Sequence, residues 1–200
     1  MDPLSWNDYF AQELYLVNRR TDETITHHVY ITTPLEKGPL FVTHHGAGSS
    51  GLSFALFASE IRKALPNAGV LSCDARGHGE TVVSESPAQA LLDLSLELLS
   101  EDLVDVINLT QKKIGWAKLP GIVLIGHSLG GAVVTDVAAS GKLGNAVLGY
   151  VVLDVVEGSA IDALQSMQSY LSSRPKSFPS IASGIEWQWV NLPWIRTFRT

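Results

Sequence analysis

The chain contains the stretch Gly121-Ile-Val-Leu-Ile-Gly-His-Ser128-Leu-Gly-Gly-Ala132, in which a short apolar run meets a Gly-x-Ser-x-Gly turn. Residues 122–125 are apolar and mostly β-branched, which is typical of a parallel strand buried on both faces. Residues 132–139 carry short side chains and favour a helix packed against that strand. Ser128 is therefore expected at a tight strand-to-helix turn, the arrangement of a nucleophile elbow.

A nucleophile elbow holds its serine in strained backbone geometry, so the neighbouring positions must lack bulk. Gly126 and Gly130 stand two residues before and two residues after Ser128, as this geometry requires. The following helix directs free N–H groups at the space above Ser128 Oγ, and the Leu129 N–H is expected to bind a developing oxyanion. The pentapeptide alone could be an ordinary turn, but the strand before it and the helix after it favour the nucleophile.

A second glycine cluster, Gly46-Ala-Gly-Ser-Ser-Gly51, follows the short apolar strand expected at residues 40–45. In a fold of this kind, such a loop turns backbone N–H groups toward the nucleophile without intervening side chains. Ala47 is the candidate for the second oxyanion donor, and His45 is expected to support the loop. The alternative is a glycine-rich turn with a structural role only.

An acidic residue follows the strand expected at residues 147–152. Asp154 stands at the carboxyl end of that strand, on the sheet edge expected to carry Ser128, where it could hold an imidazole in the tautomer that accepts the serine proton. Glu157 is a second candidate for this role. Asp136 and Asp162 lie in or near expected helices and are predicted to be solvated.

Other charged and titratable residues are predicted to have structural roles. Asp74 begins a Gly-rich turn, where it could pair with Arg76 or cap neighbouring N–H groups. His78, in the same turn, is a weak competitor for a catalytic base. His27 and His28 belong to an expected antiparallel hairpin, point to opposite faces of their strand, and are predicted to be surface residues.

The composition is that of a globular domain with a sizeable core: 200 residues, 46% apolar and 17% charged. A net charge of -6 argues against a nucleic-acid partner. The N-terminus has no basic, apolar leader, and the single cysteine, Cys73, favours a reducing compartment and a core position. An intracellular protein, cytoplasmic or nuclear and without a membrane span, is expected.

Strand and helix patterns alternate from residue 40 onward, which predicts an α/β fold with a mostly parallel sheet and helices on both faces. We expect a flexible arm over residues 1–12, one domain over residues 13–187 with a lid-like region from about residue 158, and an atypical tail over residues 188–200.

These motifs, together with Asp74-Ala-Arg-Gly-His-Gly-Glu-Thr81, resemble the α/β-hydrolase superfamily. The segment Leu153-Asp-Val-Val-Glu-Gly-Ser-Ala160, followed by Ser166-Met-Gln168 and Arg174-Pro-Lys-Ser-Phe178, is similar to the protein phosphatase methylesterase family. The resemblance implies removal of the methyl ester from the C-terminal leucine of the protein phosphatase 2A catalytic subunit. It implies Ser128 as nucleophile, Asp154 as triad acid, and no metal or organic cofactor.

The chain departs from that family in one respect. All six histidines precede Ser128, whereas a hydrolase of this family has its catalytic histidine after the triad acid. A chain that is truncated at its C-terminal end and catalytically inactive is therefore expected. The alternatives are a noncatalytic phosphatase-binding fragment and a small-molecule carboxylesterase that uses the same elbow.

Overall fold

The computed structural model describes residues 5–21, 23–85, 92–154, 172, 175 and 177–191. The chain divides into two compact units, Met1–Val155 and Val156–Thr200. In the second unit, helix α5 spans Ile181–Asn191, and the ring of Phe178 lies 5.7 Å from that of Trp187.

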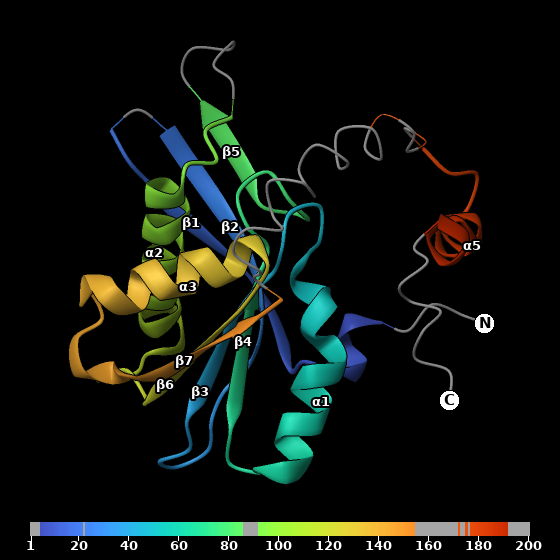
Figure 1. Cartoon of the computed structure of the whole chain (residues 1–200). Helices are drawn as coiled ribbons and strands as arrows, with labels where there is room; N and C mark the ends of the chain where they lie inside the picture. The colour runs from blue at the N-terminus through green and yellow to red at the C-terminus, as the bar shows by residue number, and fades with distance from the viewer. Residues whose placement is uncertain are drawn as a thin grey trace. The chain divides into compact units, whose positions relative to one another are not determined.

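A seven-stranded mixed sheet forms the centre of the first unit (Figure 1). Its strands run in the order β1-β2-β4-β3-β6-β7, with β5 paired to β2. Strands β4, β3, β6 and β7 are parallel, and β2 is antiparallel to both β1 and β4. The strands are β1 (Gln12–Arg19), β2 (Glu23–Thr32), β3 (Leu40–His44), β4 (Gly69–Cys73), β5 (Val82–Glu85), β6 (Ile122–His127) and β7 (Val147–Leu153).

Helices cover both faces of this sheet. Helices α2 (Leu96–Ile114) and α3 (Leu129–Ser140) lie on one face, and α1 (Ala55–Ala64) lies on the other (Figure 1). Three short 3-10 helices complete the unit: η1 (Trp6–Asp8), η2 (Gly51–Phe54) and η3 (Gly144–Ala146). The predicted α/β class, with a mostly parallel sheet between two helical layers, is confirmed.

Alternating side chains on the strands build the two halves of the core. In β3, Leu40 and Val42 are fully buried in the cluster that also contains residues of α2 and α3. Phe41 points to the opposite face, where its ring lies edge-on to that of Phe57 of α1. This period of two is what a strand covered on both faces requires, since successive side chains alternate across the sheet. Cys73 on β4 is buried in the first cluster, as predicted.

The hairpin at the N-terminal end of the sheet is confirmed, but the prediction that its histidines lie at the surface is wrong. His27 and His28 are 1% and 0% exposed. The reason is that β2 pairs with β4 and β5 as well as with β1, so it is an interior strand. The sheet around β2 is also covered on both faces, so side chains that point to either face are buried, whereas a hairpin with one solvated face exposes half of them.

Residues 5–12 also differ from the expected flexible arm. Phe10 is 2% exposed and its ring stacks on that of Tyr30 at 5.4 Å. The Ala11 N–H donates to Thr32 Oγ1 at 3.0 Å. An aromatic side chain buried in this way fixes the segment that carries it, because its release would expose apolar surface to water.

Several expectations lie outside the described residues: the second candidate acid Glu157, Asp162, most of the lid-like region, and positions 192–200 of the tail. Within the part of the chain that the structure covers, no helix is both long enough and apolar enough to cross a membrane.

Candidate active site

Ser128 lies at the junction of β6 and α3, in the geometry expected of an elbow. It is the N-cap of α3, with φ 52° and ψ -118°, and its side chain is exposed. Its N–H donates to Leu153 O of β7 at 2.9 Å, and its own carbonyl accepts from the Gly131 N–H at 2.8 Å. A positive φ is uncommon for a residue with a Cβ and costs about 1–3 kcal/mol, and such positions cluster at functional sites.

The glycines around Ser128 are required by close backbone contacts. A Cβ at Gly126 would lie 2.1 Å from Gly130 O, and one at Gly130 would lie 2.2 Å from His44 O. A Cβ at Gly46 would lie 3.1 Å from Ser128 Cβ. The second glycine cluster is therefore packed directly against the elbow, and side chains at these positions would separate the two.

The two predicted oxyanion donors are N–H groups without an acceptor among the described residues. Leu129 is the first residue of α3, where an N–H has no intrahelical acceptor. In the glycine-rich loop over residues 46–51, the N–H groups of Gly48, Ser49 and Gly51 are occupied by His78, Gly46 and Asp74. Ala47 is exposed, and its N–H donates to none of the acceptors that hold the rest of this loop. Both N–H groups are thus available to a ligand.

His45 orients the peptide group that carries the Ala47 N–H. Its Nδ1 lies 2.7 Å from Gly46 O, and its Nε2 lies 3.0 Å from the Ala75 nitrogen. Because a carbonyl only accepts and a backbone N–H only donates, His45 is neutral, with its proton on Nδ1. Burial lowers the pKa of His45, which agrees with a neutral ring. The predicted supporting role of His45 thus corresponds to two hydrogen bonds.

Asp154 lies beside the elbow on the neighbouring strand. His127 pairs with Leu153 in the β6–β7 register, so Ser128 and Asp154 both follow the last pair of residues. Asp154 has φ 54° and a side chain that is 76% exposed, and its Oδ2 lies 3.8 Å from Nε2 of His127. Local sequence patterns do not place His127 beside Asp154. The strand register is the signal that reveals it.

None of the six histidines is hydrogen-bonded to Ser128, and four of them have ring nitrogens that are bonded elsewhere. His78 Nε2 is the acceptor for the Gly48 N–H at 2.9 Å, and its Nδ1 lies 2.9 Å from Arg76 O. His44 Nδ1 lies 3.0 Å from His45 O, and burial lowers the pKa of His44 to about 4. Both nitrogens of His78 and of His45 are therefore engaged in holding loops.

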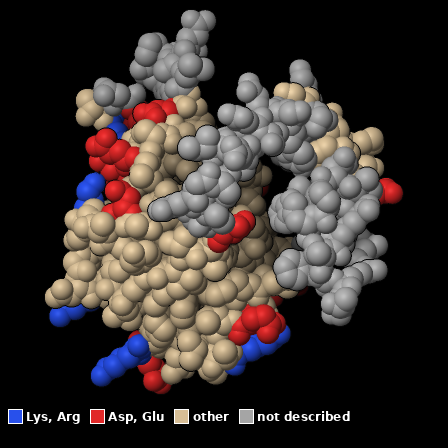
Figure 2. Space-filling model, in the orientation of Figure 1, with Lys and Arg blue, Asp and Glu red and all other residues tan. Residues whose placement is uncertain are grey.

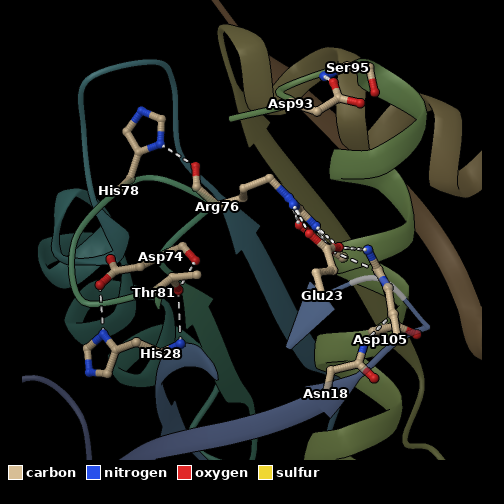
Figure 3. Close-up of polar contacts among 12 residues, drawn as sticks. Asn18, Glu23, His28, Asp74, Arg76, His78, Thr81, Asp93, Ser95 and Asp105 are labelled. Atoms are coloured by element: carbon tan, nitrogen blue, oxygen red, sulfur yellow. Dashed lines mark hydrogen bonds and ion pairs between the residues drawn. The ribbon is translucent and has the colours of Figure 1, made fainter. Parts of the chain in front are cut away.

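The turn over residues 74–81 is fixed by buried charges (Figure 3). Asp74 accepts from the N–H groups of Gly51 at 2.7 Å and Glu80 at 3.0 Å, so the expectation that it caps N–H groups holds. The alternative, a pair with Arg76, is wrong. Arg76 instead makes two bonds to Glu23 and two to Asp102.

His28 links this turn to β1. Its Nδ1 lies 2.7 Å from Asp74 Oδ2, and its Nε2 lies 2.7 Å from Glu13 Oε1. Burial by itself would lower the pKa of His28, but the two carboxylates outweigh it and raise the pKa. Asp74 changes in the opposite sense: burial would raise its pKa, and the bonds from His28 and two N–H groups lower it.

One group of three described side chains has the donor types of a metal site. Donor atoms of Glu13, His28 and Glu80 all lie within 4.8 Å of one another. The His28 nitrogen is bonded to Glu13, and the Tyr15 hydroxyl donates to Glu80. These donors satisfy one another as an ion-pair network, and the network belongs to the β1–β2 side of the sheet.

Comparison with known proteins identifies relatives in sequence. Residues 40–199 match the model of the alpha/beta hydrolase family. The chain is 62% identical over 189 residues to protein phosphatase methylesterase 1 of Aspergillus oryzae, covering 94% of this chain and 44% of that protein. It is 39% identical over 186 residues to the protein of the same name from Bos taurus, covering 92% of this chain and 45% of that protein. The predicted resemblance is confirmed, and the chain spans less than half the length of these two relatives.

Solved structures support the fold alone. A marine microorganism esterase superposes with a TM-score of 0.57 at 22% identity, covering 85% of this chain and 61% of that one. A putative epoxide hydrolase from Pseudomonas aeruginosa gives a TM-score of 0.55 at 22% identity, with coverages of 90% and 54%.

Proposed function

Because this chain belongs to the alpha/beta hydrolase family, we propose that it carries the nucleophile of a serine carboxylic ester hydrolase. The observation that carries the proposal is the exposed Ser128 at a strained elbow, facing a glycine-rich loop whose Ala47 N–H is free. The relatives named protein phosphatase methylesterase 1 support a protein methyl ester as the substrate. We assign as that substrate the methylated C-terminal leucine of the protein phosphatase 2A catalytic subunit.

In the proposed reaction, Ser128 Oγ attacks the carbonyl carbon of the methyl ester while an imidazole takes its proton. The oxyanion of the tetrahedral intermediate accepts from the N–H groups of Ala47 and Leu129. The C–O bond to the methoxy group then breaks, and the imidazolium returns the proton, so methanol leaves. Water cleaves the acyl-enzyme by the same steps. Asp154 would hold the imidazole in the accepting tautomer, and these residues perform the steps without a metal or an organic cofactor.

A second candidate function is that of a noncatalytic phosphatase-binding fragment. It is favoured by one observation: none of the six histidines in the chain is bonded to Ser128. A serine hydroxyl without a base is a weak nucleophile at neutral pH, so only binding would remain.

A hybrid protein separates the two candidates. The 189 matched residues of the Aspergillus oryzae relative would be replaced by the corresponding part of this chain, and methanol release from a peptide ending in leucine methyl ester would be measured. We expect turnover by the hybrid and none by its Ser128→Ala variant. Equal rates for the two would refute Ser128 as the nucleophile.

The unmodified chain provides the test of the binding alternative. If it binds the methylated phosphatase tail without releasing methanol, it is a noncatalytic binder as it stands. A hybrid that hydrolyses p-nitrophenyl acetate but leaves the peptide ester intact would instead identify a small-molecule esterase. In both cases, comparison of the hybrid with its Ser128→Ala variant decides whether Ser128 is the nucleophile.

A further inference from the structure

We propose that His78 is a positioning residue of the oxyanion site: it holds the Gly48 N–H and thereby fixes the Ala47 N–H for the substrate. The inference rests on the proposed function, because it assigns a use to the Ala47 N–H. It gives a role to the Asp74–Thr81 motif, which lies outside the proposed chemistry. His78 acts through the loop and touches no reacting atom.

Hydrogen-bond roles fix the state of the His78 ring. Arg76 O can only accept, so His78 Nδ1, 2.9 Å away, carries the proton (Figure 3). The Gly48 N–H can only donate, so His78 Nε2, 2.9 Å away, presents its lone pair. A neutral ring with one tautomer satisfies both bonds, and a ring protonated on both nitrogens breaks the bond to Gly48.

This bond completes the immobilisation of Ala47. The peptide before Ala47 is held at Gly46 O by His45 Nδ1 at 2.7 Å and by the Ser49 N–H at 3.2 Å. The peptide after it is held at the Gly48 N–H by His78. With both flanking peptide planes fixed, the Ala47 N–H keeps one direction, which is the preorganisation that oxyanion stabilisation needs. Gly48 itself has φ 72°, a conformation that few other residues adopt.

The loops on which His78 acts are already anchored. Asp74 holds Gly51 at the far end of the glycine-rich loop, and the Ala75 N–H holds His45. Two histidines are the titratable groups nearest to His78: the His45 ring lies edge-on to it at 5.1 Å, and the His44 ring stacks on that of His45 at 5.7 Å. The turn that carries His78 also contains the carboxylates of Asp74 and Glu80. The His78 side chain is only partly buried, so its replacement leaves the core intact.

Two substitutions of similar size separate the two bonds of His78. In His78→Gln, the side-chain oxygen takes the place of Nε2 and can still accept from Gly48. In His78→Asn, the side-chain NH₂ takes the place of Nδ1 and can still donate to Arg76 O, but nothing reaches Gly48. The proposal therefore expects His78→Gln to behave as wild type at Gly48 and His78→Asn to lose the bond.

The test uses the 200-residue chain and does not depend on activity. In wild type we expect a scalar coupling between the Gly48 amide nitrogen and His78 Nε2, measured by NMR. We expect the Gly48 amide to exchange with solvent about 3- to 10-fold faster in His78→Asn than in His78→Gln, the effect of losing one neutral hydrogen bond.

Absence of the coupling, or equal Gly48 exchange in the two variants, would overturn the proposal. If His78→Asn does not fold, the coupling in wild type still decides. In the hybrid protein described above, His78→Asn should lower kcat about tenfold with little change in KM, and His78→Gln should restore it. A hybrid without any turnover would refute the proposed function and leave the Gly48 measurements valid.

Discussion

Ser128 and Asp154 both have a positive φ, which residues with a Cβ rarely adopt. They are two of the three described non-glycine residues with positive φ. The third, Glu36, precedes the start of β3, whereas Ser128 and Asp154 follow the ends of β6 and β7. Each such position costs about 1–3 kcal/mol, so the sheet edge that carries both stores strain. Both side chains are exposed at adjacent strand ends, where the proposed function uses them on one reacting group.

Asp154 is the carboxylate that the proposed reaction needs beside the imidazole. In the hybrid protein, Asp154→Asn should lower kcat by about 10⁴-fold, because an amide stabilises the wrong imidazole tautomer. Steady-state methanol release measures this effect. Asp136→Asn, which changes an exposed carboxylate on α3, is the matched control and should leave kcat unchanged. Near-normal turnover in Asp154→Asn would assign the acid role to another carboxylate.

The buried His28 should make stability fall at alkaline pH. Its folded-state pKa is raised above the ordinary value of 6.5, so the charged ring stabilises the folded state below that pH. The contribution is lost as pH rises through the folded-state pKa. Chemical unfolding of wild type and His28→Asn at a series of pH values isolates the effect, because the amide still donates to Asp74 but carries no charge.

The expected result is a stability difference that favours wild type at pH 6 and shrinks steadily as pH rises above about 6.5. His27, His44 and His45, whose pKa values are lowered by burial, titrate in both proteins and cancel in the difference. A difference that stays constant from pH 6 to about pH 9 would show that His28 is neutral in the folded protein.

Among the elements, the junction of β6 and α3 leaves no room for a side chain at Gly126. A Cβ at Gly126 would overlap backbone atoms of Gly130, so Gly126→Ala should destabilise the protein by about 3 kcal/mol or more. Gly149 on β7 has nothing within 4 Å of its Cβ position. Gly149→Ala should therefore be neutral or stabilising by up to about 1 kcal/mol. Urea unfolding compares the two, and similar losses would show that strand propensity, not the close contact, sets the cost.

The elements themselves follow from local patterns, which explains why the sequence predicts the strands at residues 40–45 and 147–152 and the elbow between them. Contacts between distant segments do not follow from local patterns. His28 meets Glu13 and Asp74 only because β2 lies between β1 and β4, and that strand order is a property of the whole sheet. The same holds for His78 and Gly48, thirty positions apart, and for the burial of Phe10.

At the scale of the whole molecule, β7 leaves an apolar edge. Among the described strands it pairs with β6 alone, and Leu148, Tyr150, Val151, Val152 and Leu153 are each at least 39% exposed. The side of the molecule that carries α3 and β7 is largely free of charged side chains (Figure 2). Unpaired apolar strands template association with other chains.

We therefore expect concentration-dependent self-association of the 200-residue chain, measured by sedimentation velocity. Tyr150→Lys combined with Val152→Lys places two charges on one face of the edge and should shift the chain toward monomer. Leu56→Lys is the control, because Leu56 is 69% exposed on α1, away from β7. If the control variant dissociates as well, general surface hydrophobicity and not the β7 edge causes the association.

The burial of Cys73 makes its alkylation a measure of how often the folded protein opens. The thiol is 3% exposed on β4, between β2 and β3, and burial raises its pKa to about 12. Only the thiolate reacts with alkylating reagents, so a folded molecule at neutral pH is protected. Because the chain has a single cysteine, each alkylated molecule in a mass spectrum records one opening of the centre of the sheet. The rate of that mass change counts unfolding events in an unmodified chain, without an added dye or an engineered site.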